Sequence, residues 1–201
     1  MQADFENVAV VIPSLNPDDK LLRLLADLKK GGFPHIVVVN DGSAPDYDAY
    51  FKRAREEFGC DVLRHHINFG KGRALKTAFN HVLNEYPGCR GVVTVDADGQ
   101  HRIDDIRACC QAMLEHPEAL VLGSRDFSKE DVPFNSRYGN RITRQVFRLL
   151  CGAKISDTQT GLRAMSNALA ERFLTTKGER FEYEMNMLID CTEDKIPFFE
   201  V

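Results

Sequence analysis

The sequence predicts an α/β domain built on a mainly parallel β-sheet. Short apolar runs typical of strands alternate along the chain with segments that have the periodicity of amphipathic helices. Clusters of Gly, Asp and Asn separate the two kinds of segment, as turns and loops would. The 201 residues, 43% of them hydrophobic and 28% charged, are enough to bury a full core as one domain.

The first part of the chain predicts two strands and two helices. Residues 8–13 form an apolar run, which predicts the first strand. A helix should follow Asn16, with Asn16 as its N-cap and Pro17 in its first turn. One face of this helix is apolar, and Gly31-Gly32 ends it; the apolar residues are Leu21, Leu22, Leu24, Leu25 and Leu28. Residues 36–39 predict the second strand, followed by a turn at 40–43 and a polar helix to about residue 58.

The alternation continues downstream. Residues 61–64 predict a short strand, and the helix after Gly72 would bury Ala74, Leu75, Ala78, Phe79 and Val82. A fourth strand starts at Gly91, a helix spans 103–115, and residues 120–123 form another strand. The last residues, KIPFFEV, look like the beginning of a strand. We therefore expect residues 1–201 to be a single domain truncated at its C-terminus, with a downstream membrane segment possible in the full-length protein.

Composition excludes several classes of protein. A net charge of −4 gives no sign of nucleic-acid binding. The six cysteines form no C-x-x-C pair and have no metal-ligand spacing, which indicates reduced core thiols in a cytosolic protein. The sequence shows no signal peptide, and no apolar run approaches the roughly 18 residues that a membrane span needs. We expect a cytoplasmic chain that does not itself cross a membrane.

The segment GVVTVDADGQH, residues 91–101, is the most informative stretch. Its apolar strand leads into Asp96 and Asp98, and side chains two residues apart on a strand point to one face. The two carboxylates could therefore converge on one hard cation, Mg²⁺ or Mn²⁺, with the Gln100 carbonyl nearby and substrate phosphates completing the coordination. The alternative is a surface turn, because turns are rich in Asp and Gly.

Polar residues also follow the other predicted strands. In open α/β sheets, ligands bind beyond the carboxyl ends of the strands, where the chain places these groups together. They are Ser14, Asn16, Asp41, Lys71, Asp96, Asp98 and Ser124-Arg125. Lys71 lies between two glycines, but the spacing of a P-loop is absent, as is the G-x-G-x-x-G of a dinucleotide site. Kinase and dehydrogenase functions are therefore disfavoured.

Together these pieces resemble family 2 glycosyltransferases of the GT-A (nucleotide-diphospho-sugar transferase) fold, a Rossmann-like three-layer α/β/α sandwich. The resemblance is strongest to the branch that loads sugars onto polyprenyl phosphates, such as dolichol-phosphate sugar synthases, and covers nearly the whole chain. The matching pieces, in order, are VVIPSLNP, VVVNDGS, NFGKGRALKTAFN, VDADGQH, GSRD, NSRYGNR and DTQTGLRA. Their joint order is specific, although each piece alone is not.

The resemblance implies a nucleotide-sugar site. Pro13, Ser14 and Asn16 would line the nucleotide pocket, Asp41 would hydrogen-bond the base, and Lys71 and Gly72 would lie near the nucleotide. Asp96 would face the nucleotide sugar and the metal, with Asp98 and Gln100 as the metal ligands proper. Many relatives have Y-N-E where this chain has Leu15-Asn16-Pro17, which leaves the choice between UDP and GDP open.

The resemblance also implies an acceptor-phosphate site at Arg125 and Arg137, with Ser136 and Arg163 as further candidates. Arginine suits this task because its planar fork binds phosphate through two hydrogen bonds. In a helix over residues 135–151, one face would carry Arg137, Arg141, Arg144 and Arg148 and the opposite face would be apolar. Such a helix could lie on anionic lipid at the cytoplasmic face of a membrane, or it could be an ordinary surface helix.

The expected chemistry is inverting, metal-dependent sugar transfer from a UDP- or GDP-linked donor. A lipid phosphate acceptor is already anionic, whereas a saccharide hydroxyl acceptor, the alternative, would need a carboxylate base. Asp157 is the best candidate for that base or for acceptor positioning, and capping a turn is its alternative role. Glu182 and Glu184 are weaker candidates that more often would be solvated or ion-paired, and His101 is expected to be a hydrogen-bonded neighbour of the metal turn.

Two other classes compete with this interpretation. A nucleotidyltransferase would need a Gly-rich, Arg-bearing signature after the first strand, which Pro13-Ser14-Leu15 does not supply. A catalytically silent nucleotide-sugar binding or scaffold domain is the non-enzyme alternative. The presence of Asp96, Asp98 and Asp157 argues against such decay.

Overall fold

The structure is a computed structural model, and it describes residues 5–124 and 160–201. Its elements in chain order are β1 (Val8–Ser14), α1 (Asp19–Lys30), β2 (His35–Asp41), η1 (Pro45–Tyr47), α2 (Asp48–Glu56), β3 (Asp61–His65), α3 (Lys71–Glu85), β4 (Gly91–Thr94), α4 (Ile103–Glu115), β5 (Leu120–Leu122), β6 (Arg163–Ser166), α6 (Asn167–Phe173), α7 (Glu182–Glu193) and β7 (Phe198–Glu200). The predicted alternation of strands and helices is confirmed.

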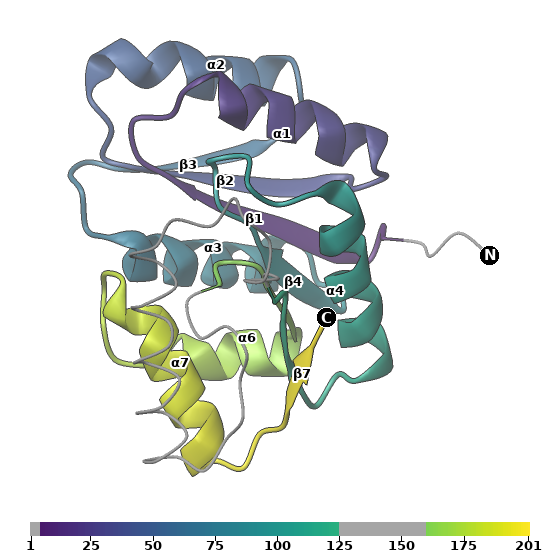
Figure 1. Cartoon of the computed structure of the whole chain (residues 1–201). Helices are drawn as coiled ribbons and strands as arrows, with labels where there is room; N and C mark the ends of the chain where they lie inside the picture. The colour runs from purple at the N-terminus through teal and green to yellow at the C-terminus, as the bar shows by residue number, and fades with distance from the viewer. Residues whose placement is uncertain (1–4, 125–159) are drawn as a thin grey trace, which may run out of the picture.

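Within the described residues the strands form one seven-stranded sheet in the order β3-β2-β1-β4-β6-β5-β7. β1 pairs in parallel with β2 and β4, β2 with β3, and β5 with β7. Only β6 runs antiparallel to its neighbours in that sheet, β4 and β5. The sheet is therefore mixed and mainly parallel, as expected for the GT-A fold (Figure 1).

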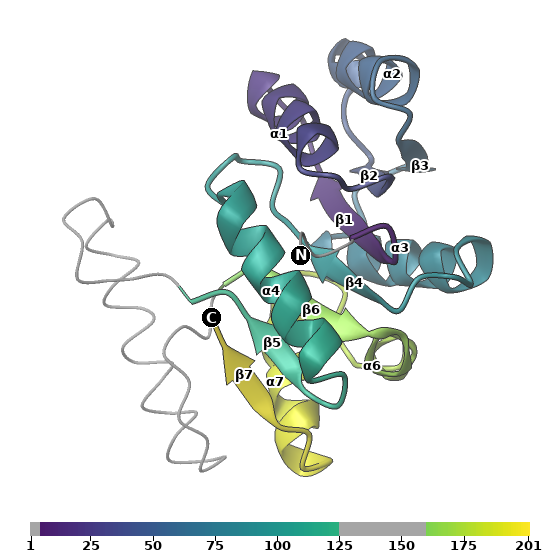
Figure 2. The ribbon, with the colours of Figure 1, turned by 90° about the vertical axis from the view of Figure 1, so that its right-hand side faces the viewer.

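Alternate residues of the central strands bury themselves in two cores. Val8, Val10 and Ile12 of β1 pack with α1, α2 and α4 on one face of the sheet. Ala9 and Val11 face the opposite core, which α3, α6 and α7 complete. Figure 2 shows α4 lying across the half of the sheet formed by β4, β6 and β5. The result is the predicted three-layer α/β/α arrangement.

Three local predictions need correction. Asp18 rather than Asn16 is the N-cap of α1, and its side chain accepts a hydrogen bond of 2.8 Å from the Lys20 N–H. β4 ends at Thr94, so Asp96 and Asp98 lie in the loop beyond it. β6 and α6 were not predicted from the sequence, because β6 has only four residues, too few for a strand period to be recognised.

Other predictions are confirmed or fall outside the description. β7 forms where the C-terminal segment predicted a strand. Five of the six cysteines (Cys60, Cys89, Cys109, Cys110 and Cys191) are buried free thiols. The basic helix predicted for 135–151 lies outside the described residues. Among the described helices, none combines the length and apolarity needed to cross a membrane.

Candidate active site

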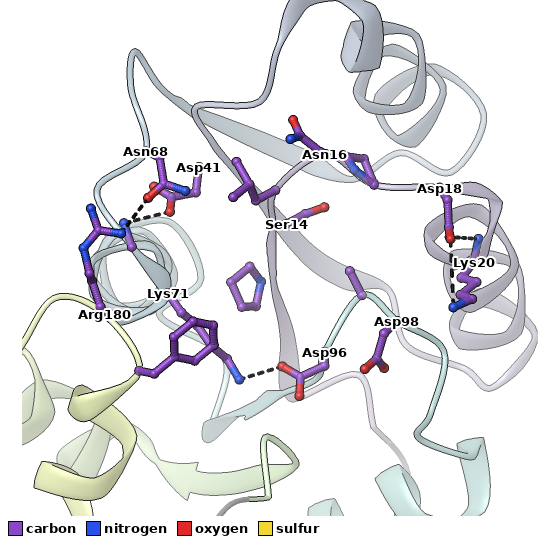
Figure 3. A pocket seen from close by; sticks show the side chains of 16 residues that line it. Ser14, Asn16, Asp18, Lys20, Asp41, Asn68, Lys71, Asp96, Asp98 and Arg180 are labelled. Atoms are coloured by element: carbon purple, nitrogen blue, oxygen red, sulfur yellow. Dashed lines mark hydrogen bonds and ion pairs between the residues drawn. The ribbon is translucent and has the colours of Figure 1, made fainter. Parts of the chain in front are cut away.

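A cavity of about 430 Å³ opens beyond the carboxyl ends of β1, β2 and β4. Seven of the predicted site residues line it: Pro13, Ser14, Asn16, Asp41, Lys71, Asp96 and Asp98. Figure 3 shows Ser14, Asp41, Lys71, Asp96 and Asp98 around this cavity. The parallel topology brings them together because these strands all end at the same edge of the sheet.

The loop after β1 is fixed by Asn16. Its backbone has a φ of 49°, in the left-handed region that Asn tolerates better than most residues. The Asn16 N–H donates to Ser43 Oγ at 2.8 Å, and its side-chain carbonyl accepts from the Ala44 N–H at 3.1 Å. These bonds tie the β1 loop to the loop after β2 and form one wall of the cavity.

Asp41 is an anchor for a second loop. Its buried carboxylate accepts hydrogen bonds from the Phe69 N–H at 3.0 Å, from the Gly70 N–H at 2.8 Å and from His65 Nδ1 at 2.7 Å. His65 Nε2 in turn lies 2.9 Å from the Thr77 hydroxyl. The carboxylate that was predicted to bind the base holds the turn that precedes Lys71.

Lys71 and Asp96 form the charged wall of the cavity. Lys71 Nζ lies 2.7 Å from Asp96 Oδ1 and 2.9 Å from Glu184 Oε2, so the prediction that Glu184 is a pairing charge is confirmed. Burial opposes the charged form of Lys71, but Glu184 and then Asp96 raise the pKa of its ammonium. Burial likewise opposes ionised Asp96, yet His101 and Lys71 hold its pKa well below the usual range. Both groups are therefore charged at neutral pH.

Asp98 and Gln100 lie at the outer side of the cavity. Both residues are exposed, and the Gln100 N–H donates to Asp98 Oδ1 at 3.0 Å, which closes the turn. His101 Nε2 is 3.7 Å from Asp96 Oδ2, too far for a hydrogen bond. Asp98 shares the cavity wall with Asp96, whereas Gln100 does not line the cavity.

The donor set fits a cation that is shared with a substrate. Among the described residues, no group of three His, Cys, Asp or Glu side chains could hold a metal ion. Mg²⁺ does not require such a cage, since it commonly binds one or two carboxylates together with substrate phosphates. Asp96 and Asp98 line one cavity and match that pattern. They do so from a loop beyond β4, and not from a strand as the sequence predicted.

Two glycines have structural rather than lining positions. Gly72 is buried, and a Cβ there would lie 2.5 Å from Tyr183 Cβ, so this glycine lets α3 and α7 approach each other. It does not line the cavity beside the Lys71 that precedes it. Gly161 packs against the Asp96 side chain, where a Cβ would lie 2.6 Å from Asp96 Cγ. Its carbonyl accepts a hydrogen bond of 2.8 Å from the Thr94 hydroxyl.

Arg163 is buried away from solvent, with 1% of its surface exposed. Its Nε donates to the Thr160 carbonyl at 3.0 Å, and its Nη1 donates to the Glu184 carbonyl at 2.6 Å. Arg163 Nη2 has no hydrogen-bond partner among the described residues. The other acceptor-site candidates, Arg125, Ser136 and Arg137, and the candidate base Asp157 lie outside the described residues.

Sequence reasoning missed part of the cavity wall. Asn68, Arg180 and Phe181 also line it, and Arg180 Nη1 donates to Asn68 Oδ1 at 3.3 Å. Phe181 is 78% exposed, unusual for a large apolar side chain. Arg180 and Phe181 are more than a hundred residues from Asn68 in sequence and belong to no recognisable pattern, so only the approach of α7 to α3 reveals them.

The comparisons with known sequences identify the family of the chain. The family model described as Glycosyl transferase family 2 matches residues 9–174. An uncharacterized protein of Methanocaldococcus jannaschii is 33% identical over 200 residues, which cover 98% of this chain and 80% of that protein. The UDP-N-acetylglucosamine–dolichyl-phosphate N-acetylglucosaminyltransferase of Methanococcus voltae is 27% identical over 96% of this chain and 83% of its own length.

A solved structure shares the fold. Glucosyl-3-phosphoglycerate synthase from Mycobacterium tuberculosis, in complex with Mn²⁺, UDP and glucosyl-3-phosphoglycerate, matches with a TM-score of 0.74. The match covers 98% of this chain and 69% of that one at 18% identity. At this identity the likeness establishes the fold alone.

Proposed function

Because this chain belongs to glycosyltransferase family 2, we propose that it transfers a sugar from a nucleoside-diphosphate sugar to a polyprenyl phosphate lipid with inversion at the anomeric carbon. The observation that carries the donor half of this proposal is the meeting of Ser14, Asp41, Lys71, Asp96 and Asp98 in one cavity. The Ser14 hydroxyl is buried there with no hydrogen-bond partner among the described residues, which a bound ligand would supply.

Asp96 and Asp98 are the proposed ligands of a divalent cation, Mg²⁺ or Mn²⁺. When bound, the cation would neutralise negative charge on the departing nucleoside diphosphate. The structurally similar glucosyl-3-phosphoglycerate synthase was crystallised with Mn²⁺ and UDP, which supports a divalent cation as cofactor here. Lys71, whose ammonium lies 2.7 Å from Asp96, would add a fixed positive charge beside the same leaving group.

The acceptor half rests on chemistry and on a relative. The relative from Methanococcus voltae carries dolichyl phosphate in its name, and a lipid phosphate is the proposed acceptor here. Its anionic oxygen would attack the anomeric carbon as the bond to the diphosphate breaks, so no strong base is needed. Arg125, Ser136 and Arg137 remain the proposed phosphate-binding residues, and Asp157 the proposed residue that positions the acceptor. Arg163 is no longer among them, because it is buried and donates to the Thr160 and Glu184 carbonyls.

The same proposal sets the location of the protein. A polyprenyl phosphate acceptor is held in a bilayer, so the enzyme would act at the cytoplasmic face of a membrane. The basic segment 137–150 or a segment beyond residue 201 would provide the membrane contact. Residues 1–201 are taken as one catalytic domain.

Titration calorimetry with UDP and GDP, each with and without Mn²⁺, tests the donor site. We expect one nucleotide to bind, more tightly with Mn²⁺, and the gain from Mn²⁺ to disappear in Asp98→Ala. Asp46→Ala, at an exposed carboxylate that does not line the cavity, is the matched control and should behave as the wild type. Equal Mn²⁺ dependence in wild type and Asp98→Ala would sink the metal assignment.

A second experiment tests the acceptor. The wild type is incubated with the nucleotide sugar that binds and with either a polyprenyl phosphate in detergent or a free oligosaccharide. Sugar transfer to the lipid phosphate is expected. Transfer only to the oligosaccharide would replace the lipid acceptor by a saccharide hydroxyl while leaving the donor site intact.

A further inference from the structure

We infer that Glu184 is a positioning residue of the donor site, which holds the Lys71 ammonium in place to receive the diphosphate of the donor. This inference rests on the proposed function. It assigns a task to a carboxylate that does not line the cavity and that the sequence favoured only as a solvated or ion-paired group.

The geometry places Glu184 directly behind Lys71. Glu184 lies in the first turn of α7, and Lys71 is the first residue of α3. Glu184 Oε2 is 2.9 Å from Lys71 Nζ, and the two side chains are only 12% and 16% exposed. Asp96 contacts the same ammonium at 2.7 Å from the cavity side (Figure 3). The Lys71 ammonium is thus held between two carboxylates.

We expect Asp96 and Glu184 to differ in whether they keep their contact with Lys71 once a ligand binds. Asp96 lines the cavity and is a proposed ligand for the cation and the sugar, so its carboxylate has other partners in the loaded site. Glu184 does not line the cavity, and among the described residues its carboxylate forms an ion pair with Lys71 only. Lys71 has a long and flexible side chain, and without Glu184 no other described residue would form an ion pair with its ammonium when Asp96 turns to the ligand.

The backbone around Glu184 is also fixed. Its carbonyl accepts the 2.6 Å hydrogen bond from buried Arg163, and its neighbour Tyr183 packs on Gly72. These contacts set the distance between α7 and the first turn of α3. Glu184 Oε1 is buried and has no hydrogen-bond partner among the described residues, so in that part of the chain Lys71 is the only polar side chain that the carboxylate contacts.

A merely structural ion pair between α3 and α7 would predict different behaviour. Loss of a structural pair would lower the affinity of every ligand of the cavity by the same factor, or would leave all affinities unchanged. Loss of a positioning charge should weaken a nucleoside diphosphate more than the matching monophosphate, because the second phosphate is the group that Lys71 is proposed to meet. The ratio of the two affinities therefore separates the two roles.

The experiment measures the dissociation constants of UDP, UMP, GDP and GMP by calorimetry in the presence of Mn²⁺ for wild type, Glu184→Gln, Glu184→Asp and Lys71→Met. Glu184→Gln keeps the shape of the side chain and removes its charge. We expect it to weaken the preferred diphosphate about tenfold, the scale of one charge-assisted hydrogen bond, and the monophosphate less than about twofold. Glu193→Gln, at an exposed position of the same helix, is the control and should match the wild type.

Two further variants make the test decisive. Glu184→Asp retains the carboxylate on a shorter side chain and should lose less diphosphate affinity than Glu184→Gln. Should Glu184→Gln fail to fold, this smaller loss, again greater for the diphosphate than for the monophosphate, is the expected result. In Lys71→Met the further change Glu184→Gln should have no effect on diphosphate affinity. Unchanged diphosphate affinity in Glu184→Gln, or an equal loss for diphosphate and monophosphate, would overturn the inference. Failure of the wild type to bind any of the four nucleotides would instead overturn the proposed function, and this inference with it.

Discussion

Replacing Gly161 by alanine should damage the donor site through Asp96. The added Cβ would lie 2.6 Å from Asp96 Cγ and 2.8 Å from Asp96 Oδ1. Carbon atoms in ordinary contact are about 3.5–4.0 Å apart, so the carboxylate must move by about 1 Å. That movement breaks its 2.7 Å contact with Lys71. Gly161 does not have a left-handed φ, so the effect arises from the contact and not from backbone strain.

The cost can be estimated from these contacts. Overpacking costs about 1–3 kcal/mol, and we take about 2 kcal/mol because Asp96, 30% exposed, can partly relax toward solvent. For a chain of this size that corresponds to a Tm lowered by roughly 4–8 °C. Nucleotide affinity in the presence of Mn²⁺ should fall by about tenfold or more, since a shift of 1.4 kcal/mol is a factor of ten.

The assay combines thermal unfolding with calorimetry on Gly161→Ala and a control. Gly88→Ala is the matched control because a Cβ there meets nothing within 4 Å. It should leave nucleotide binding unchanged and could raise the stability slightly by restricting the unfolded chain. Wild-type nucleotide affinity in Gly161→Ala would refute the argument that Gly161 sets the position of Asp96 within the site.

Three further predictions concern stability. Gly72→Ala would bring a Cβ to 2.5 Å from Tyr183 Cβ, so the free energy of unfolding in urea should fall by about 1–3 kcal/mol; an unchanged urea midpoint would contradict the close packing of α3 on α7. Asp18→Ala removes the N-cap of α1 and should cost about 1 kcal/mol in the same measurement, whereas Asn16→Ala should not fray this helix in circular dichroism. Burial raises the pKa of Cys60 to about 11 and of Cys109 to about 12, so both thiols stay protonated in the folded state, whereas in the unfolded chain they ionise above about pH 8.5. The free energy of unfolding should therefore fall as the pH rises from about 8.5 toward 11–12, and the fall should be shallower in Cys109→Ala.

The order of strands and helices could be predicted because each element carries its own pattern. The apolar face of α1 repeats at the helical period, and the predicted leucines are all buried. Successive residues of β1 are buried in opposite cores, and this is why its sequence is a continuous apolar run, as in other strands that are covered on both faces. β6 and α6 were not predicted because both segments are short. Four residues are too few to show the period of a strand, and β6 becomes buried only when it packs between β4 and β5.

The members of the candidate site could be predicted in part, and their contacts could not. Ser14, Asp41 and Asp96 were recognisable as polar residues that follow apolar runs. They were expected to meet because parallel strands end at one edge of a sheet, and all three line the cavity. The predicted N-cap at Asn16 was wrong because Asp18, two residues later, accepts the Lys20 N–H instead. Local patterns do not specify which of two capping residues the loop will present to the helix.

The sequence by itself determined the α/β class, the strand-end position of the site and the family to which the chain belongs, because these depend on local periodicity and on the order of short motifs. The tertiary structure decided which side chains meet. Lys71 and Glu184 are more than a hundred residues apart, and only the close packing of α7 on α3 at Gly72 brings their charges to 2.9 Å. Long-range charge pairing of this kind follows from the packing of helices against the sheet, which no local pattern in the chain encodes.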